Sequence, residues 1–530
     1  MSLSSKRGMK HYYSNLIMGP KVENTKRIAK NTLMLYVRML FSMLVSLYTS
    51  RVVLNTLGIE DYGIYNVVGV FVAMFSLISS SLSSASSRFL TFELGKGDMM
   101  QLKRVFSTSL LIHIALAVIV FISLETVGVW FLNNRMTIPA ERLYAANWVF
   151  QASIVSFILG LISVSYNASI VSHEHMEVFA SIGIVDVLLR LGIVLFIAYS
   201  SLNFDKLIIY SLLLVLVGVC LQCVYFGYCR KHFEECHLHF CFDKMTWKEM
   251  SSFAGWNFIG CTAALFKDHG VNLLLNLFVG PVLNAARGIA TSVNAAVFSF
   301  VGNFMAALSP QITKSYATEE YSYMMSLVER GSRFSFYILL MLALPILFET
   351  EFVLTLWLKE YPAHTVNFVR LVLLLTLCDV LSNTLITLQN ATGKIRNYQL
   401  AVGGVLMLNF PLSYICLKMN FPPESVFVVA LLISVVCLLL RLIFLKRMVQ
   451  LSIRRYLNKV CFNVSFVSLS AIILPCIIYM NMEYGWLRFL SVTVVCLLCS
   501  FISIYIIGCS ISERRFIIDK FKVIVTRITR

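Results

Sequence analysis

The sequence predicts an all-α integral membrane protein with about 14 transmembrane helices. Of its 530 residues, 58% are hydrophobic and only 13% are charged, whereas soluble domains are about half apolar and a quarter charged. Apolar runs of about 20 residues, the length that crosses a bilayer, follow one another towards the C-terminus. This composition argues against a soluble enzyme, a disordered protein and a small disulfide scaffold.

Fourteen apolar segments are long enough to be membrane spans. They cover residues 33–54, 63–85, 106–132, 146–167, 178–199, 207–228, 253–279, 284–308, 334–350, 365–388, 398–417, 425–440, 460–480 and 487–509. The connections between them are short, and none is long enough for a folded domain outside the membrane. We therefore expect the protein to work within the membrane.

The distribution of Lys and Arg predicts the orientation of these spans. With a cytoplasmic N-terminus, the cytoplasmic segments hold 32 of these residues, the opposite side holds 6, and 6 lie in spans. Because cytoplasmic loops are enriched in Lys and Arg, both termini are expected in the cytoplasm. The net charge of +17 thus comes mainly from topology signals, and no nucleic-acid partner is expected.

A weak internal repeat relates the two halves of the chain. After the first span the sequence reads LNTLG at 54–58 and YGI at 62–64, and after the seventh it reads LNLFVG at 275–280 and RGI at 287–289. Both copies follow a span that runs from inside to outside, which is typical of a parallel repeat about an axis along the membrane normal. Chance similarity between apolar helices is the alternative explanation.

Two stretches of the chain resemble bacterial polysaccharide flippases of the Wzx type. SLYTSRVVLNTLGIEDYGIYN at 46–66 is similar to their first hairpin, and NAARGIA at 284–290 with SPQITKSY at 309–316 is similar to the start of their second lobe. These proteins belong to the multidrug/oligosaccharidyl-lipid/polysaccharide (MOP) exporter superfamily. The resemblance implies a MATE-like bundle of two six-helix lobes and transport by alternating access. The last two spans depart from the commonest twelve-span form.

The resemblance and the span pattern together predict six segments. These are a cytoplasmic N-terminal segment (1–30), an N-lobe of spans 1–6 (31–230), a cytoplasmic linker (231–252), a C-lobe of spans 7–12 (253–450), an extra hairpin of spans 13 and 14 (451–509) and a cytoplasmic basic tail (510–530).

Ionisable residues inside spans are candidates for function, because they are costly in a bilayer and usually face an interior cavity. The basic ones are Arg38, Arg51, Arg190, Lys267, Arg287 and Arg370, and the acidic ones are Glu125, Asp186, Asp268 and Asp379. The surplus of positive charge suits an anionic head group such as a lipid diphosphate. We therefore predict that Arg38, Arg51, Lys267 and Arg287 bind substrate in a basic cavity. For Arg51, near a span end, the alternative is snorkelling to the membrane surface.

Helical spacing predicts how some of these residues are arranged. At about 100° per residue, Arg287, Thr291 and Asn294 share one face of their span, and Arg38 and Ser42 share another. Polar faces from both lobes would line a hydrated, basic cavity. The alternative is that these groups only satisfy neighbouring helices.

Two acidic residues are candidates for coupling transport to a cation or proton. Asp379 has no obvious local partner in the sequence, and Asp268 lies beside Lys267. Asp186 and Arg190 are instead expected to pair with each other, since they are four residues apart on one helix.

No cofactor, metal or catalytic residue is predicted, and the chain is not expected to be an enzyme. The Cys and His residues around 229–241 match no standard zinc spacing. The absence of a P-loop argues against ATP hydrolysis by this chain.

The resemblance and the basic surplus lead to one preferred function. It is the flipping of undecaprenyl-diphosphate-linked oligosaccharide across the bacterial inner membrane, for O-antigen, capsule or exopolysaccharide synthesis. The expected partners are this lipid-linked substrate, membrane lipid and other polysaccharide-assembly proteins. The alternatives are a cation-coupled multidrug exporter of the MATE type, a lipid II flippase and a membrane polysaccharide polymerase. The basic surplus disfavours an exporter of cationic drugs, and the short loops disfavour a polymerase.

Overall fold

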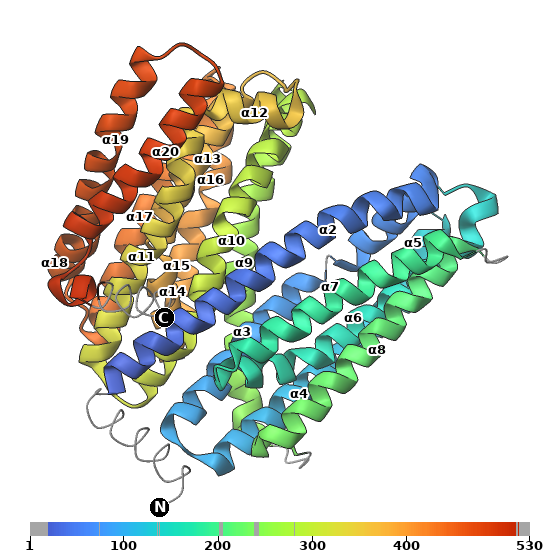
Figure 1. The fold of residues 1–530 in the computed structure, drawn as a ribbon. Helices are drawn as coiled ribbons and strands as arrows, with labels where there is room; N and C mark the ends of the chain where they lie inside the picture. Colours follow the sequence, from blue (N-terminus) through green and yellow to red (C-terminus); the bar gives the residue numbers. More distant parts are fainter. Residues whose placement is uncertain are drawn as a thin grey trace, which may run out of the picture. The chain divides into compact units, whose positions relative to one another are not determined.

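The computed structural model describes residues 20–73, 75–134, 136, 138–200, 205–237, 243–279, 281–515 and 518. Within these residues all regular structure is helical (Figure 1), so the predicted all-α class is confirmed. The chain divides into two compact units: unit 1 comprises Met1–Phe258 and Ala306–Glu319, and unit 2 comprises Ile259–Met305 and Glu320–Arg530. The predicted segments 1–30 and 510–530 lie largely outside the described residues.

Unit 1 is built mainly from the first helices of the chain. They are α2 (Pro20–Ala73), α3 (Ser76–Lys96), α4 (Met99–Ser123), η1 (Leu124–Gly128), α5 (Val129–Asn134), η2 (Ala140–Arg142), α6 (Leu143–Ser172), α7 (Met176–Tyr199), α8 (Lys206–His232) and η3 (Glu234–Cys236). Two long helices, α9 (Lys244–Val279) and α10 (Pro281–Ala317), each run through both units. They are therefore the helical connections between the units.

Unit 2 contains the remaining helices. They are α11 (Tyr321–Phe348), α12 (Thr350–Leu358), α13 (Thr365–Val380), α14 (Asn383–Thr392), α15 (Arg396–Met407), α16 (Asn409–Lys418), α17 (Ser425–Val449), α18 (Ile453–Tyr456), η4 (Leu457–Phe462), α19 (Asn463–Asn481), α20 (Trp486–Ser503) and η5 (Ile504–Gly508).

Twelve helical segments of the described chain are long and apolar enough to cross a membrane. They correspond to twelve of the fourteen predicted spans, and the other two are 63–85 and 253–279. The first of these crosses from α2 into the serine-rich start of α3. The second lies in α9, where Lys267 and Asp268 lower the hydropathy.

Helix boundaries in unit 1 follow local chemistry. Asp98 and Asp205 cap the N-termini of α4 and α8, accepting backbone N–H bonds from Gln101 at 3.0 Å and from Leu207 at 2.9 Å. Gly58 has φ +82° and ψ 170° inside α2, a conformation that favours glycine and divides α2 into two helices across a kink. The first predicted span ends just before this kink.

Small polar residues hold α3, α4 and α6 together in unit 1. The buried Ser109 hydroxyl of α4 is 2.7 Å from that of Ser86 on α3 and 2.9 Å from that of Ser165 on α6. Small side chains let helices in a membrane approach closely, and their hydroxyls satisfy one another there. In this part of α3 the serines serve packing.

The C-terminal hairpin of α19 and α20, drawn in red in Figure 1, packs against α11. The Glu349 carboxylate that follows α11 is buried and accepts two bonds from Arg488 of α20, at 2.8 and 3.1 Å. Beside this pair the rings of Phe352 and Phe489 stack at 4.5 Å. The hairpin is therefore an integral part of unit 2.

We predict that Glu349→Leu lowers the free energy of unfolding in detergent by about 3 kcal/mol, because Arg488 keeps its charge in a buried place without a counterion. Replacing both residues by leucine should cost less, because no buried charge then remains. Thermal unfolding followed by circular dichroism measures both effects. A double variant less stable than either single variant would contradict the pairing.

Candidate functional site

A polar cavity of about 430 Å³ lies inside unit 2. Its walls come from α9, α10, α13, α16 and α17. The polar side chains that line it are Lys267, Asn272, Arg287, Thr291, Asn294, Thr376, Asp379 and Asn409. Phe427 and several aliphatic residues complete the wall. Three carboxamides, two hydroxyls and three ionisable groups thus meet in one cavity, and four of its five helices belong to segments that are apolar enough to cross a membrane.

The α10 wall of the cavity agrees with the helical spacing of the sequence. Arg287, Thr291 and Asn294 all line the cavity, as expected for residues that share one face. Asn294 accepts a hydrogen bond from the Thr376 hydroxyl of α13 at 2.7 Å. The Arg287 guanidinium lies 5.9 Å from the centre of the Phe427 ring, within cation–π range. A guanidinium and an aromatic ring therefore lie next to each other in the wall of the cavity.

An ion pair crosses the cavity between α9 and α13. Lys267 Nζ lies 3.0 Å from Asp379 Oδ2, and the same carboxylate accepts a hydrogen bond from the Ser434 hydroxyl of α17. The Asn409 amide donates to the Lys267 carbonyl oxygen at 2.9 Å. Lysine and aspartate neutralise each other, so the ionisable lining of Lys267, Asp379 and Arg287 carries a net formal charge of +1.

This pairing adds a contact that the sequence did not reveal. Asp379 has no partner on its own helix, but it has one on α9, more than 100 residues earlier in the chain. Local spacing cannot reveal such a contact, because it depends on which helices pack together. The side chain of Asp268, the other coupling candidate, lies outside the side chains that the structure describes.

The two other basic candidates, Arg38 and Arg51, belong to α2 of unit 1. Arg38 is half-buried, and its guanidinium lies 4.5 Å from the centre of the Phe179 ring of α7. A Cβ atom at Gly183 would come within 2.9 Å of the Arg38 side chain, so the glycine makes room for it. Arg51 is exposed, as the alternative of snorkelling predicts.

The expected pair of Asp186 and Arg190 is present on α7, with an N–O distance of 2.7 Å. Both residues are partly exposed, and the pair belongs to a single helix. It is therefore a local structural contact.

No pattern in the sequence indicated the role of Glu174. Its carboxylate is 1% exposed and accepts bonds at 2.7 Å from Arg27 Nε of α2 and from Lys314 Nζ of α10. It also accepts a bond at 2.5 Å from the Gln311 amide. Gln311 and Lys314 belong to the SPQITKSY stretch, where two polar side chains three residues apart on a helix indicate a polar contact but not its partner. All these residues lie in unit 1, where Glu174 anchors the last turns of α10.

Metal binding finds no support among the described residues, where no three His, Cys, Asp or Glu side chains are grouped to hold an ion. His173, in the polar loop after α6, instead pairs with Glu235 at 2.7 Å and stacks on Phe233. His239 and Cys241 lie outside the described residues.

A family model described as polysaccharide biosynthesis protein matches residues 28–317, more than half of the chain. The chain belongs to this family. The matched residues include Arg38, Arg51, Lys267 and Arg287, whereas Asp379 lies beyond them. The uncharacterized membrane protein EpsK of Bacillus subtilis (strain 168) is 20% identical over 307 residues, which are 58% of this chain. The chain matches 60% of the length of that relative.

Solved structures show that this member of the polysaccharide biosynthesis family has a MATE-like fold. A MATE protein in its straight conformation superposes with a TM-score of 0.68 at 13% identity, covering 81% of this chain and 96% of the other. A MOP superfamily transporter from Pyrococcus furiosus gives the same values. An outward-facing multidrug resistance MATE transporter gives a TM-score of 0.67 at 14% identity, covering 81% and 96%. Family and fold agree with the resemblance to Wzx-type flippases of the MOP superfamily and indicate a transporter rather than an enzyme.

The ion pair of Lys267 and Asp379 leads to a prediction about stability. Lys267→Gln and Asp379→Asn should each lower the melting temperature, because each leaves a charge among apolar helices without its counterion. The double variant should recover part of the loss, with a coupling energy of about 1–3 kcal/mol in a double-mutant cycle. The matched control is the exposed pair Arg190→Gln with Asp186→Asn, whose coupling should stay below about 0.5 kcal/mol. Equal coupling in the two cycles would contradict a special role for the cavity pair.

The Glu174 contact generates a second prediction. Glu174→Gln should speed amide hydrogen exchange in residues 306–317, because the end of α10 loses the carboxylate that holds it. Exchange followed by mass spectrometry reads this segment directly. Glu177→Gln is the control, since Glu177 and its partner Lys30 are both largely exposed and such pairs contribute little. If exchange in 306–317 is unchanged by Glu174→Gln, the carboxylate does not anchor α10.

Proposed function

We propose that this chain flips undecaprenyl-diphosphate-linked oligosaccharide from the cytoplasmic to the periplasmic leaflet of the bacterial inner membrane. The observation that carries the proposal is the polar cavity of unit 2, with its net positive lining among membrane-spanning helices. Membership in a polysaccharide biosynthesis family and the MATE-like fold support a transporter for such a substrate. The excess of Lys and Arg in the predicted cytoplasmic loops supports cytoplasmic termini.

The lining of the cavity suits the head group of this substrate. A guanidinium such as that of Arg287 binds phosphate oxygens through two parallel hydrogen bonds. The amides of Asn272, Asn294 and Asn409 and nearby hydroxyls offer donors and acceptors to sugar hydroxyls, and the Phe427 ring offers an apolar face. We infer that this cavity binds the diphosphate and the first sugar, while the lipid tail stays in the bilayer.

The pair of Lys267 and Asp379 offers a way to couple binding to a proton or cation. When a phosphate approaches, the Lys267 ammonium can leave Asp379 for the stronger negative charge. The carboxylate would then keep only its bond from Ser434, and a proton or a cation would neutralise it. In this proposal Asp379 is the coupling residue, and Asp268 remains a second candidate for the same role.

Alternating access requires the two units to move, and α9 and α10 are the helices that run through both. Pro310 lies inside α10 close to the point where unit 1 resumes, and proline permits bending because it removes a backbone hydrogen bond. In this proposal Arg38 and Arg51, which belong to α2 of unit 1, are two further basic residues that bind substrate. An inside-negative potential favours outward movement of an anion by about 2.3 kcal/mol per charge per 100 mV.

The decisive experiment uses a deletion strain and follows the surface polysaccharide and the leaflet position of its lipid-linked precursor. Loss of polymer with complete precursor on the cytoplasmic side would support the flippase. Precursor accumulating on the periplasmic side would indicate a polymerase, and normal polymer with altered drug tolerance would indicate multidrug export. Loss of peptidoglycan synthesis would indicate a lipid II flippase.

We predict that Arg287→Glu abolishes surface polysaccharide in the complemented strain at an unchanged protein level, because a carboxylate repels the diphosphate. Lys394→Glu makes the same change of charge at an exposed position of unit 2 that does not line the cavity, and it should leave the polymer intact. Normal polymer with Arg287→Glu would count against substrate binding in this cavity.

A further inference from the structure

A second cavity, of about 570 Å³, lies where α17 ends and the chain turns into α18 and η4. It is separate from the polar cavity and shares no lining residue with it. We propose that this cavity binds the phosphate head group of an anionic phospholipid from the surrounding membrane. The proposal does not depend on which substrate the protein transports.

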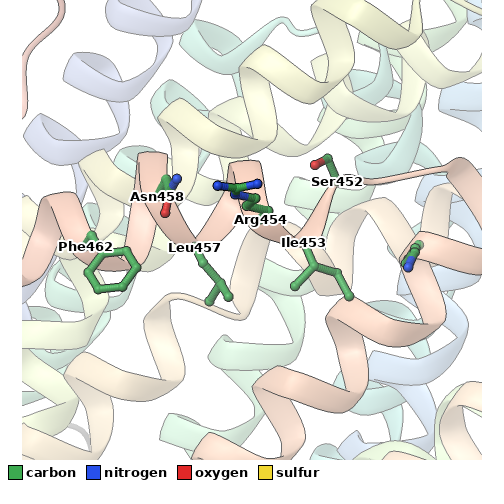
Figure 2. Close-up of a pocket in the computed structure, with 7 residues that line it drawn as sticks. Ser452, Ile453, Arg454, Leu457, Asn458 and Phe462 are labelled. Carbon is green, nitrogen blue, oxygen red and sulfur yellow. The ribbon is translucent and has the colours of Figure 1, made fainter.

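The side chains of this cavity fall into two groups. Figure 2 shows Ser452, Arg454 and Asn458 along one side of the α18–η4 segment, and Ile453, Leu457 and Phe462 along the other. Lys446, near the end of α17, also lines the cavity. The lining thus offers two cations, an amide and a hydroxyl together with three hydrocarbon side chains. This combination matches an amphiphile whose polar part is an anion.

Within the part of the chain that the structure describes, no acidic side chain pairs with either cation of this cavity. Among the described residues, no carboxylate lies within 4 Å of Lys446 or Arg454, whereas the neighbouring Arg455 and Lys459 both pair with Glu329, at 2.5 and 3.7 Å. The lining therefore carries a formal charge of +2, with no matching acid among the described residues. A phosphate would supply the missing negative charge and accept bonds from Arg454 in a bidentate manner.

A buried tyrosine fixes the α18 segment that lines this cavity. The Tyr456 side chain, 1% exposed, lies between Arg454 and Asn458 in sequence. Its hydroxyl is 2.8 Å from the Ser332 hydroxyl of α11 and donates to the Leu381 carbonyl oxygen at 2.7 Å. Since this contact fixes the α18 turn on unit 2, the surrounding side chains are arranged before any ligand binds.

The position of the cavity selects a lipid over a free anion. It lies at the junction of two segments apolar enough to span a membrane, Ser425–Val449 and Ile453–Asn481, so it faces the membrane surface. Basic pockets at such a surface bind anionic lipid head groups, and the exposed ring of Phe462 is placed to contact acyl chains. Free phosphate would use the cations but not the apolar side.

The test is native mass spectrometry of the full chain in detergent, titrated with phosphatidylglycerol or phosphatidylcholine. The protein should bind one phosphatidylglycerol more tightly than any phosphatidylcholine. Lys446→Gln with Arg454→Gln should weaken this binding roughly 30-fold, because each cation near an anionic lipid contributes a factor of about five. The matched control, Arg447→Gln with Lys459→Gln, removes the same charge from residues outside the lining and should change it less than about twofold.

Two further measurements separate the remaining outcomes. Leu457→Asn keeps all charges and should also weaken phosphatidylglycerol binding. Arg454→Lys keeps the charge but loses the bidentate geometry, so it should weaken binding less than Arg454→Gln does. Inorganic phosphate at millimolar concentration should not displace the lipid. The proposal is overturned if the two double variants lose binding equally, if Leu457→Asn has no effect, or if inorganic phosphate displaces the lipid completely.

Discussion

A charge among apolar helices must meet a partner, and this constraint organises both units of the protein. Three carboxylates are each joined to at least one lysine or arginine of a helix. Glu174 binds Arg27 and Lys314, Glu349 binds Arg488, and the half-buried Asp379 binds Lys267. Removing one partner of such a pair costs far more than the pair contributes, because the remaining charge cannot reach water. The helices that carry these residues are thereby held in one arrangement.

These ion pairs differ in whether a ligand can reach them. The pair of Glu349 and Arg488 is largely buried. The Arg488 guanidinium lies 4.5 Å from the centre of the Tyr479 ring and 5.0 Å from the centre of the Tyr484 ring. It therefore serves only to fix the C-terminal hairpin. The pair of Lys267 and Asp379 instead faces a cavity, and Asp379 is 38% exposed on its side chain. Under the proposed function, an anion in this cavity draws Lys267 away from Asp379, and the carboxylate then takes up a proton or a cation.

The same reasoning separates the two cavities of unit 2. In the polar cavity a carboxylate accompanies the cations, which favours a ligand that is released again. In the cavity beside α18 no carboxylate of the described residues accompanies Lys446 and Arg454, while Glu329 pairs with their neighbours Arg455 and Lys459. Such an arrangement favours a ligand that stays bound, as a structural lipid does.

The sequence by itself determined the helical membrane class, twelve of the spans and the family. These depend on composition and on runs of about 20 residues, which each segment carries alone. It also predicted that Arg287, Thr291 and Asn294 share a face, because that follows from the pitch of one helix. Only the tertiary structure decided that Asp379 meets Lys267, that Glu174 holds α10, and that the last hairpin joins unit 2. Those contacts join helices far apart in the chain, and helix packing, which local spacing does not encode, brings their side chains together.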